Sequence, residues 1–356
     1  MTRMSEPSIN SEIDAIEELY SRGFTDGLPV VPPTLSRVER AIAAAGRAGG
    51  ELIGLVAPRF GRATVEKIAV NAVMAGCRPE YLAVVIAGVQ AICDDAFDLL
   101  GISGTTDAVA PFFLINGPVR KALDINCGAG VFGPGWRANA TIGRALRLVW
   151  VNIGGAKPGI ISMSTFGHPG RYTYCIGENE EENPWEPFHV EQGFRHSDST
   201  ISALAGEAPQ VTSAPRSRTA KDILTAIARS MEVIGHYKAT ALGDTLVVLS
   251  PEHARTIAAD GWSKADVRQF LWERLQKPFK ELLPGIDGGE GLPDHILAAH
   301  QSPETNGTLI PKFRAPEQLK VAVAGGTAGR FTAVIAGWPF ANAPSSLVIK
   351  KVRAPE

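Results

Sequence analysis

The apolar residues of this chain change their spacing repeatedly, from a helical period to short dense runs and back. Ile142, Leu146 and Val149 recur at helical spacing, and the double glycine at 154–155 ends the pattern, which predicts a long amphipathic helix over Arg137–Asn152. The segment AVAPFFLI at 108–115 is short and densely apolar, as is typical of a buried strand. This alternation predicts a mixed α/β protein in which helices cover the sheets.

Other segments continue the alternation along the chain. Helical spacing predicts further helices over 11–22 with Ser11 as N-cap, 35–46, 63–76, 80–93, 219–234, 251–259 and 263–275. Apolar runs predict further strands over 245–249, 319–324, 331–336 and 346–350. Pro111 indicates that the strand at 108–115 lies at a sheet edge or carries a bulge. The break from Gly76 to Pro79 predicts an αα-hairpin, since proline suits the first turn of a helix.

The length of 356 residues allows one large domain or two closely packed domains. The best linker candidates are two polar, proline-rich stretches at 206–218 and 283–315. We therefore expect a soft boundary near residue 210. It would separate an N-terminal α/β domain (1–210), which carries the active region, from a C-terminal α/β domain (211–356).

Composition restricts the partners of this chain. With 35 basic and 37 acidic residues, the net charge is -2, which provides no large positive field for nucleic acid. The four cysteines form no CxxC pair and the N-terminus lacks a signal-peptide pattern, so we expect reduced thiols and a cytoplasmic protein. No apolar run approaches the roughly 18 residues of a membrane span. The sequence identifies no cofactor and no metal ligands, and we expect a homo-oligomer.

A glycine-rich loop runs directly into the predicted helix at Arg137. The first backbone N–H groups of a helix lack internal partners and carry partial positive charge, so such a junction can bind a carboxylate or phosphate. The candidate substrate-binding residues here are Asn126, Gly133, Gly135, Arg137 and Asn139. The loop matches neither GxxxxGK[ST] nor GxGxxG, so it indicates no nucleotide class. The alternative is a tight structural turn.

A second candidate region combines histidines, carboxylates and an arginine within a weakly periodic stretch at 156–198. His168, Glu178, Glu180 and His189 are candidate acid/base residues, and Arg171 is a candidate substrate ligand. On a strand, His189 and the glutamate two residues later would share one face. The alternatives are a metal site, although no HExxH spacing is present, and a solvated acidic loop.

Two cysteines are candidate nucleophiles or redox thiols. Cys77 lies at a predicted helix junction beside Arg78, where a helix N-terminus and a cation would lower the thiol pKa. Cys127 lies in the glycine-rich loop. The alternative for both is an inert, buried thiol.

The sequence GGTAGR at 325–330 lies between two predicted strands. A glycine-rich hairpin is the favoured interpretation, and a backbone cradle for an anion is the alternative.

Several long stretches resemble bacterial proteins classed with the UGSC-type seleno/thiol protein family. The matching stretches, spread over about two-thirds of the chain, are TDGLPVVPPT, GRATVEKIAVNAVMAGCRPEYL, FGPGWRANATIGRALRL, GHPGRYTYCIGENEEENPWEPFHVEQGF and LSPEHARTIAADGWSKADVR. The resemblance implies a stand-alone enzyme, or an enzyme subunit that acts with a thiol or selenol partner protein. The UGSC string is absent here, so a direct redox role is not implied. Within the family, Cys77 is favoured over Cys127 as the shared feature.

These features lead to one main functional hypothesis and two alternatives. The main hypothesis is an enzyme that acts on a small anionic metabolite or xenobiotic by lyase-like or thiol-dependent reductive chemistry. It requires the glycine-rich loop and the 168–191 stretch to face one cavity. The alternatives are a non-catalytic scaffold subunit of a thiol/selenol redox complex and a metal-dependent hydrolase.

Overall fold

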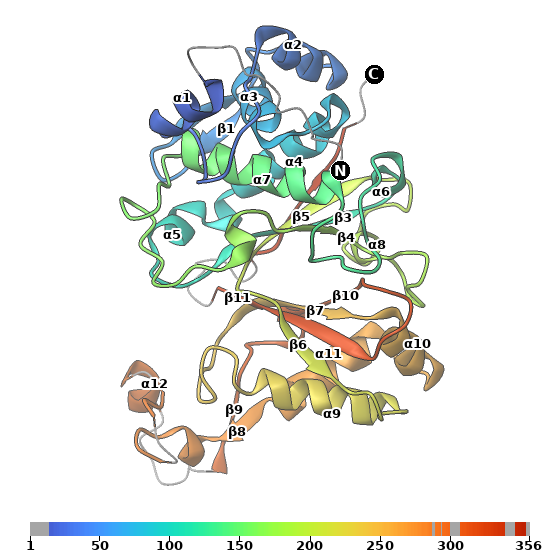
Figure 1. The fold of residues 1–356 in the computed structure, drawn as a ribbon. Helices are drawn as coiled ribbons and strands as arrows, with labels where there is room; N and C mark the ends of the chain where they lie inside the picture. The colour runs from blue at the N-terminus through green and yellow to red at the C-terminus, as the bar shows by residue number, and fades with distance from the viewer. Residues whose placement is uncertain (1–13, 287–288, 293, 300–306, 339–345, 354–356) are drawn as a thin grey trace, which may run out of the picture.

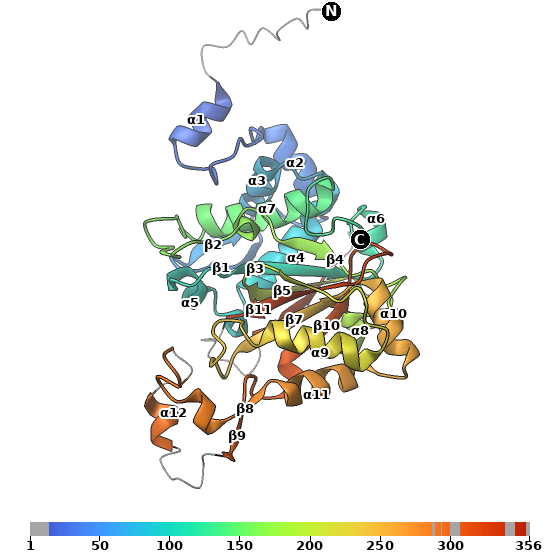
Figure 2. The same ribbon diagram turned by 60° about the horizontal axis from the view of Figure 1, so that its bottom comes forward.

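The computed structural model describes residues 14–286, 289–292, 294–299, 307–338 and 346–353, so the predicted N-cap Ser11 lies outside the described residues. Figure 1 shows helices above a first group of strands, a second group of strands below it, and further helices at the bottom. The same layering is seen in Figure 2. The predicted fold class is confirmed, because one mixed eight-stranded sheet is covered by helices.

The helices of the upper layer come from the first half of the chain. They are α1 (Ala15–Ser21), α2 (Leu35–Ala44), α3 (Val65–Ala75), α4 (Leu82–Ile92), α5 (Leu99–Gly104), α6 (Val119–Ala122) and α7 (Arg137–Asn152). The start of α3 is fixed by Thr64, whose hydroxyl accepts a hydrogen bond from the backbone N–H of Lys67. Its end is fixed by Gly76, which adopts a left-handed conformation with φ of 90°.

The lower helical layer comes from the second half of the chain. It contains α9 (Ala220–Met231), α10 (Pro251–Ala259) and α11 (Lys264–Arg274), while α8 (Phe188–Glu191) lies near the strands and α12 (Asp294–Ala299) near the bottom of Figure 1. Ser263 and Asp266 form a capping box at the start of α11. These helices match the predicted helical segments at 219–234, 251–259 and 263–275 closely.

The large sheet contains eight of the described strands. They are β3 (Ala110–Asn116), β4 (Cys175–Gly177), β5 (Thr200–Gly206), β6 (Gln210–Ser213), β7 (Gly243–Leu249), β10 (Leu319–Val323), β11 (Phe331–Gly337) and β12 (Val348–Lys351). The main order is β10-β7-β11-β5-β3-β4, with β12 beside β5 and β6 beside β11. Two small antiparallel pairs lie outside it, namely β1 (Leu52–Val56) with β2 (Gly61–Thr64) and β8 (Gln276–Pro278) with β9 (Leu309–Pro311).

The large sheet has two halves that pack face to face, with β3, β4 and β5 in one half and β7, β10 and β11 in the other. Along β3, Phe113 and Ile115 face the helices α3, α4 and α7, while Phe112 and Leu114 face inward toward β7, β10 and β11. The two ends of the strand order approach each other, since the backbone N–H of Asn179, just after β4, donates to the carbonyl of Val323 in β10 at 2.7 Å. The chain segments around this junction therefore come from distant parts of the sequence.

Two predictions about strands are wrong. Pro111 lies in a strand with neighbours on both sides, not at an edge. It is tolerated there because β4 is short and pairs only with residues 113–115, so the missing N–H faces no strand. The GGTAGR segment is not a hairpin, because β10 and β11 do not pair with each other and lie on opposite sides of β7.

The predicted linkers contain strands of the structure. β6 lies within 206–218 and pairs with β11, and β9 lies within 283–315, part of which falls outside the described residues. The sheet continues across residue 210, since β5 and β6 both pair with β11. The division into 1–210 and 211–356 stays a prediction. None of the described helices has the length and apolar content needed to span a bilayer.

Candidate functional site

A cavity of about 350 Å³ lies between α2, the end of α3 and the start of α7, and four arginines line it. These are Arg37 and Arg40 from α2, Arg78 from the turn after α3, and Arg137 from the first turn of α7. Cys77 lies in the same wall. The remaining lining residues are Val31, Ala41, Val73, Gly76 and Pro79. The cavity thus combines an apolar floor with cationic walls.

Local backbone structure brings these segments together. The extended stretch before α2 is attached to α3, because the backbone N–H of Val31 donates to the carbonyl of Met74 at 3.0 Å. The left-handed Gly76 turns the chain sharply at the end of α3, and the proline at position 79 starts the next helical turn. The predicted αα-hairpin of α3 and α4 is confirmed, and its connection forms one wall of the cavity.

Backbone carbonyls, not carboxylates, hold two of the four arginines in place. Arg37 donates from Nη1 to the carbonyl of Pro32 at 2.8 Å. Arg137 donates from Nε and Nη2 to the carbonyl of Gly76 at 3.0 and 2.9 Å. A carbonyl orients a guanidinium without neutralising it, and neither group is paired with a carboxylate in the part of the chain that the structure describes.

The other two arginines have even fewer contacts. Neither Arg40 nor Arg78 forms a hydrogen bond to another described residue through its side chain, and neither forms an ion pair within the described ranges. Both side chains are exposed to solvent. Because guanidinium groups match the geometry of carboxylate and phosphate oxygens, this arrangement favours an anion with more than one negative charge.

The prediction that Cys77 has a lowered thiol pKa is wrong. Cys77 follows the C-terminal end of α3, and burial raises the pKa of its thiol to about 12, although Thr141 and Arg137 act in the opposite direction. The thiol donates a hydrogen bond to the carbonyl of Thr141 at 3.3 Å. At neutral pH this group is therefore a neutral thiol and not a nucleophilic thiolate.

The predicted acid/base residue Glu178 lies at the junction of the two sheet halves. Its carboxylate is fully buried and accepts from Asn116 Nδ2 at 2.5 Å, from the N–H of Phe188 at 2.6 Å, from Asn183 Nδ2 at 3.0 Å and from the N–H of Val323 at 3.3 Å. Burial raises its pKa, and these donors oppose that effect. All four partners are donors, so the geometry fits a structural carboxylate that joins three segments.

Next to the carboxylate of Glu178, the buried guanidinium of Arg120 lies close to two further carboxylates and one thiol. Its guanidinium lies 2.8 Å from Glu180 and 3.1 Å from Glu181, and it lies 3.8 Å from the sulfur of Cys127. The hydrogen bond from Arg120 lowers the pKa of Glu181 to about 2. Burial raises the pKa of the Cys127 thiol, while Arg120 opposes this. Most of the charge of this arginine is therefore neutralised by carboxylates.

The side chains of His189 and Glu191 have different partners in the structure. Both lie in α8 and not on a strand, so the prediction that they share a face is wrong. His189 is fully buried with Nδ1 3.8 Å from Glu180, and burial lowers its pKa. Glu191 instead accepts from Lys264 at 3.3 Å and from Arg268 at 2.6 Å.

His168 and Arg171 lie in a different region, near the start of β3. Arg171 donates to the carbonyl of Val109 at 2.7 and 3.1 Å and to the hydroxyl of Ser162 at 2.9 Å. His168 packs edge-on against Tyr174, with ring centroids 5.5 Å apart, and burial lowers its pKa. Neither residue lines the arginine cavity.

The glycine-rich loop is held to α7 by two asparagines. The N–H of Asn126 donates to Asn139 Oδ1 at 2.8 Å, and Asn139 Nδ2 donates to the carbonyl of Asn126 at 2.9 Å. Both side chains are buried and fix the loop to the helix, and their role as substrate ligands stays a prediction. Gly133 and Gly135 are exposed, and Gly135 adopts a positive φ of 120° that favours glycine.

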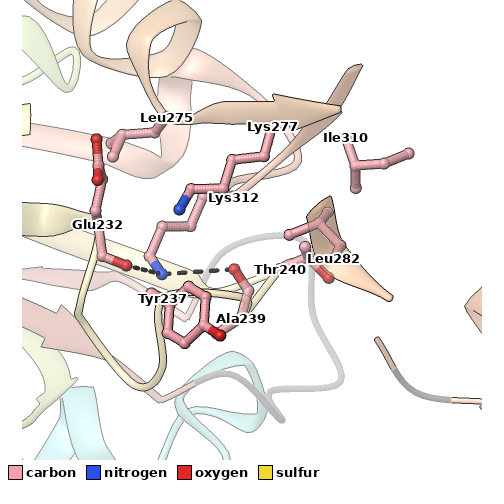
Figure 3. A pocket seen from close by; sticks show the side chains of 9 residues that line it. All are labelled: Glu232, Tyr237, Ala239, Thr240, Leu275, Lys277, Leu282, Ile310 and Lys312. Carbon is pink, nitrogen blue, oxygen red and sulfur yellow. Dashed lines mark hydrogen bonds between the residues drawn. The ribbon is translucent and has the colours of Figure 1, made fainter. Parts of the chain in front are cut away.

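A smaller concavity at the opposite end of the molecule encloses the ammonium group of Lys312. Figure 3 shows the ammonium group directed toward the backbone carbonyls of Glu232 and Ala239, which lie at 3.1 and 3.5 Å. The ammonium group also donates to the backbone carbonyl of His236 at 2.9 Å. Burial lowers the pKa of Lys312 to about 8. The free space, about 10 Å³, accommodates no metabolite, and the three carbonyls follow the end of α9. We interpret Lys312 as a cap of that helix end.

Apart from the asparagines and glycines of the glycine-rich loop, the structure places the predicted residues in three regions. Cys77 and Arg137 meet in the arginine cavity, a second group surrounds Arg120, and His168 lies with Arg171. The second group consists of Glu178, Glu180, His189 and Cys127. Within the described ranges, no group of three His, Cys, Asp or Glu side chains is arranged to hold a metal ion.

Sequence reasoning missed Arg37 and Arg40 as candidate ligands. They are three residues apart, so they share one face of α2, which is the one signal the sequence offered. It also missed Arg120, which organises the acidic cluster.

No protein-family model matches the chain, and no curated protein matches it significantly.

Proposed function

We propose that this chain is an enzyme acting on a small anionic metabolite or xenobiotic, and that the arginine cavity binds the anionic part of the substrate. The observation that carries the proposal is the meeting of four guanidinium groups, none of them paired with a carboxylate among the described residues, around one cavity of about 350 Å³. That volume is typical of a small-molecule site. Since the whole chain has a net charge of -2, this local excess of positive charge is a specific feature and not a general one.

The side chains that line the cavity indicate which class of substrate fits it. Arginine binds phosphate and carboxylate oxygens through pairs of parallel hydrogen bonds, and two guanidinium groups here are unengaged. The apolar side chains of Val31, Ala41 and Val73 would contact a short carbon skeleton. A phosphorylated or dicarboxylated small molecule fits both features.

Cys77 is the thiol that lines this cavity, and it is protonated at neutral pH, so covalent or reductive chemistry at its sulfur requires removal of that proton first. The described lining contains no histidine or carboxylate that could accept its proton. Under this proposal the substrate or a thiol partner protein accepts the proton, and the cavity supplies binding and orientation. The lyase-like or thiol-dependent reaction predicted from the sequence stays a prediction.

The proposal is tested by calorimetric titration with inorganic pyrophosphate, succinate and the uncharged ribose. We expect saturable binding of the two anions that weakens as salt is added, and no binding of ribose. Replacing both Arg40 and Arg78 with alanine is expected to weaken pyrophosphate binding by at least about a hundredfold, since each charge-assisted contact contributes about 1.5 to 3 kcal/mol.

The matched control is Arg216→Ala, which removes an exposed arginine in the loop between β6 and α9. It should leave the affinity unchanged. Equal affinities in the double variant and the control, or no saturable binding of either anion by the native chain, would rule out the cavity as the anion site.

A second candidate function, a docking subunit, is favoured by an exposed apolar patch. Ile160, Met163, Phe166 and Tyr172 are 66%, 55%, 92% and 48% exposed. Patches of this kind commonly mark interfaces between proteins. Light scattering on the purified chain distinguishes the cases: a stable homo-oligomer that Phe166→Ser dissociates would assign the patch to self-association, and a monomer would leave it for a partner protein.

A further inference from the structure

The four arginines of the arginine cavity form two pairs that come from different walls. Arg37 and Arg40 are one turn apart on α2, and both line the cavity from the same face of that helix. Arg78 and Arg137 meet at the end of α3, because the guanidinium of Arg137 lies 3.0 and 2.9 Å from the carbonyl of Gly76, in the turn that carries Arg78. Two walls of one cavity therefore each present two guanidinium groups.

Both pairs combine one anchored guanidinium with one unengaged guanidinium. On α2, a backbone carbonyl holds Arg37, whereas the side chain of Arg40 donates to no other described residue. At the end of α3, a backbone carbonyl holds Arg137, whereas the side chain of Arg78 donates to no other described residue. An anchored guanidinium is preorganised for one edge of an anionic group, and an unengaged neighbour can bind the remaining oxygens. Each pair thus has the parts of a subsite for one anionic group.

The charge of the cavity distinguishes between the two classes of anion that fit it. Four guanidinium groups line the cavity, and its described lining contains no carboxylate. Three carboxylates of the neighbouring segments, Glu39, Glu80 and Asp124, do not line the cavity and form no ion pair with the four arginines within the described ranges. A dicarboxylate supplies two negative charges, whereas one phosphoryl group carries about 1.5 to 2 at neutral pH. Two phosphoryl groups therefore match the four guanidinium groups more closely than two carboxylates do.

We propose that the substrate of this cavity carries two phosphoryl groups at the ends of a short carbon skeleton, one for each arginine pair. This inference rests on the proposed function, since it assigns two subsites to the same cavity. The apolar side chains of Val31, Ala41 and Val73 offer no partner to a charged group, so they contact the skeleton. At the second pair, the first turn of α7 adds partial positive charge, because its N-cap Trp136 provides no side-chain hydrogen bond to the helix end.

The test titrates the native chain with propane-1,3-diphosphonate in a calorimeter. Its matched controls are propylphosphonate, which lacks one phosphonate group, and glutarate, which has two carboxylates on the same three-carbon chain. We expect the diphosphonate to bind at least about thirtyfold more tightly than propylphosphonate, because its second group reaches the second subsite without a further loss of translational freedom. It should also bind about tenfold more tightly than glutarate, whose two charges leave half of the guanidinium charge unmatched. Equal affinities for the diphosphonate and either control would overturn the proposal, whereas the proposed function fails only if the cavity binds no anion.

Single variants test whether the two pairs act as separate subsites. Arg40→Ala and Arg78→Ala should each weaken binding of the diphosphonate by about tenfold or more, since each removes a charge-assisted contact. Binding of propylphosphonate should stay within about threefold in both variants, because its one phosphonate group can use the intact pair. The control Arg216→Ala should change neither affinity. Equal losses for the two ligands in each single variant would mean that all four arginines hold one anionic group, which would overturn the proposal and leave the proposed function in place.

Discussion

Replacing Glu178 with glutamine is expected to lower the free energy of unfolding by about 1 to 3 kcal/mol, the cost of leaving a buried hydrogen-bond donor unsatisfied. The carboxylate accepts four hydrogen bonds from donors in three segments of the chain. An amide retains one oxygen, but its NH₂ group would face donors and leave at least one of them unsatisfied in the interior. The affected contacts join β10 to the residues after β4, so both sheet halves should loosen together.

Urea denaturation monitored by tryptophan fluorescence measures this loss. The matched control is Glu186→Gln, in the same segment, whose side chain is exposed and which should change stability by less than about 0.5 kcal/mol. A stable Glu178→Gln protein would contradict the structural role assigned here. In that case the carboxylate would again be a candidate acid/base residue.

Helices were predictable in this chain because their signals are local. The apolar stripe of α7 and the glycines after it specify Arg137–Asn152, and the structure has the helix at those residues. Capping residues such as Ser263 and the break at Gly76 act within a few positions of the helix end. Their effect does not depend on distant parts of the chain.

Several strands were not predictable for the opposite reason. β5, with the sequence TISALAG, is buried along its whole length, so it lacks the alternation of apolar and polar residues that marks a half-exposed strand. β6 is short, and three of its four residues are exposed. β5 pairs along its length with β3 and with β12, and β6 pairs with β11; all these partners lie more than about 80 residues away in the sequence, which no local pattern reveals.

The candidate site shows the same limit. Arg137 could be selected because it follows a glycine-rich loop, but the polar face of α2 looked like any solvated helix face. Only the packing of α2 against the end of α3 brings Arg40 to the cavity. Burial also makes the thiol pKa of Cys77 higher, where the sequence predicted a lower one. The sequence shows that a cation is adjacent to the thiol, but it does not show that the thiol is shielded from solvent.

The four cysteines are expected to differ sharply in reactivity. At pH 8, a thiol with a pKa of about 12 is a thiolate in roughly one molecule in 10⁴, so Cys77 should react with iodoacetamide about a thousandfold more slowly than an ordinary exposed thiol. Burial likewise raises the pKa of Cys93 to about 12 and the pKa of Cys175 still further. Cys127, half-buried beside Arg120, should be labelled first.

Mass spectrometry of peptides from the labelled native chain measures the four rates, and the variant Cys127→Ser identifies the fastest one. Pyrophosphate should slow labelling at Cys77 further while leaving Cys127 unchanged, because a bound anion beside a thiol raises its pKa. Rapid labelling of Cys77 in the free protein would mean that the thiol is activated by a group other than those lining the cavity. A Cys77 rate that ignores pyrophosphate, under conditions where calorimetry detects binding, would place the anion elsewhere than among the four arginines.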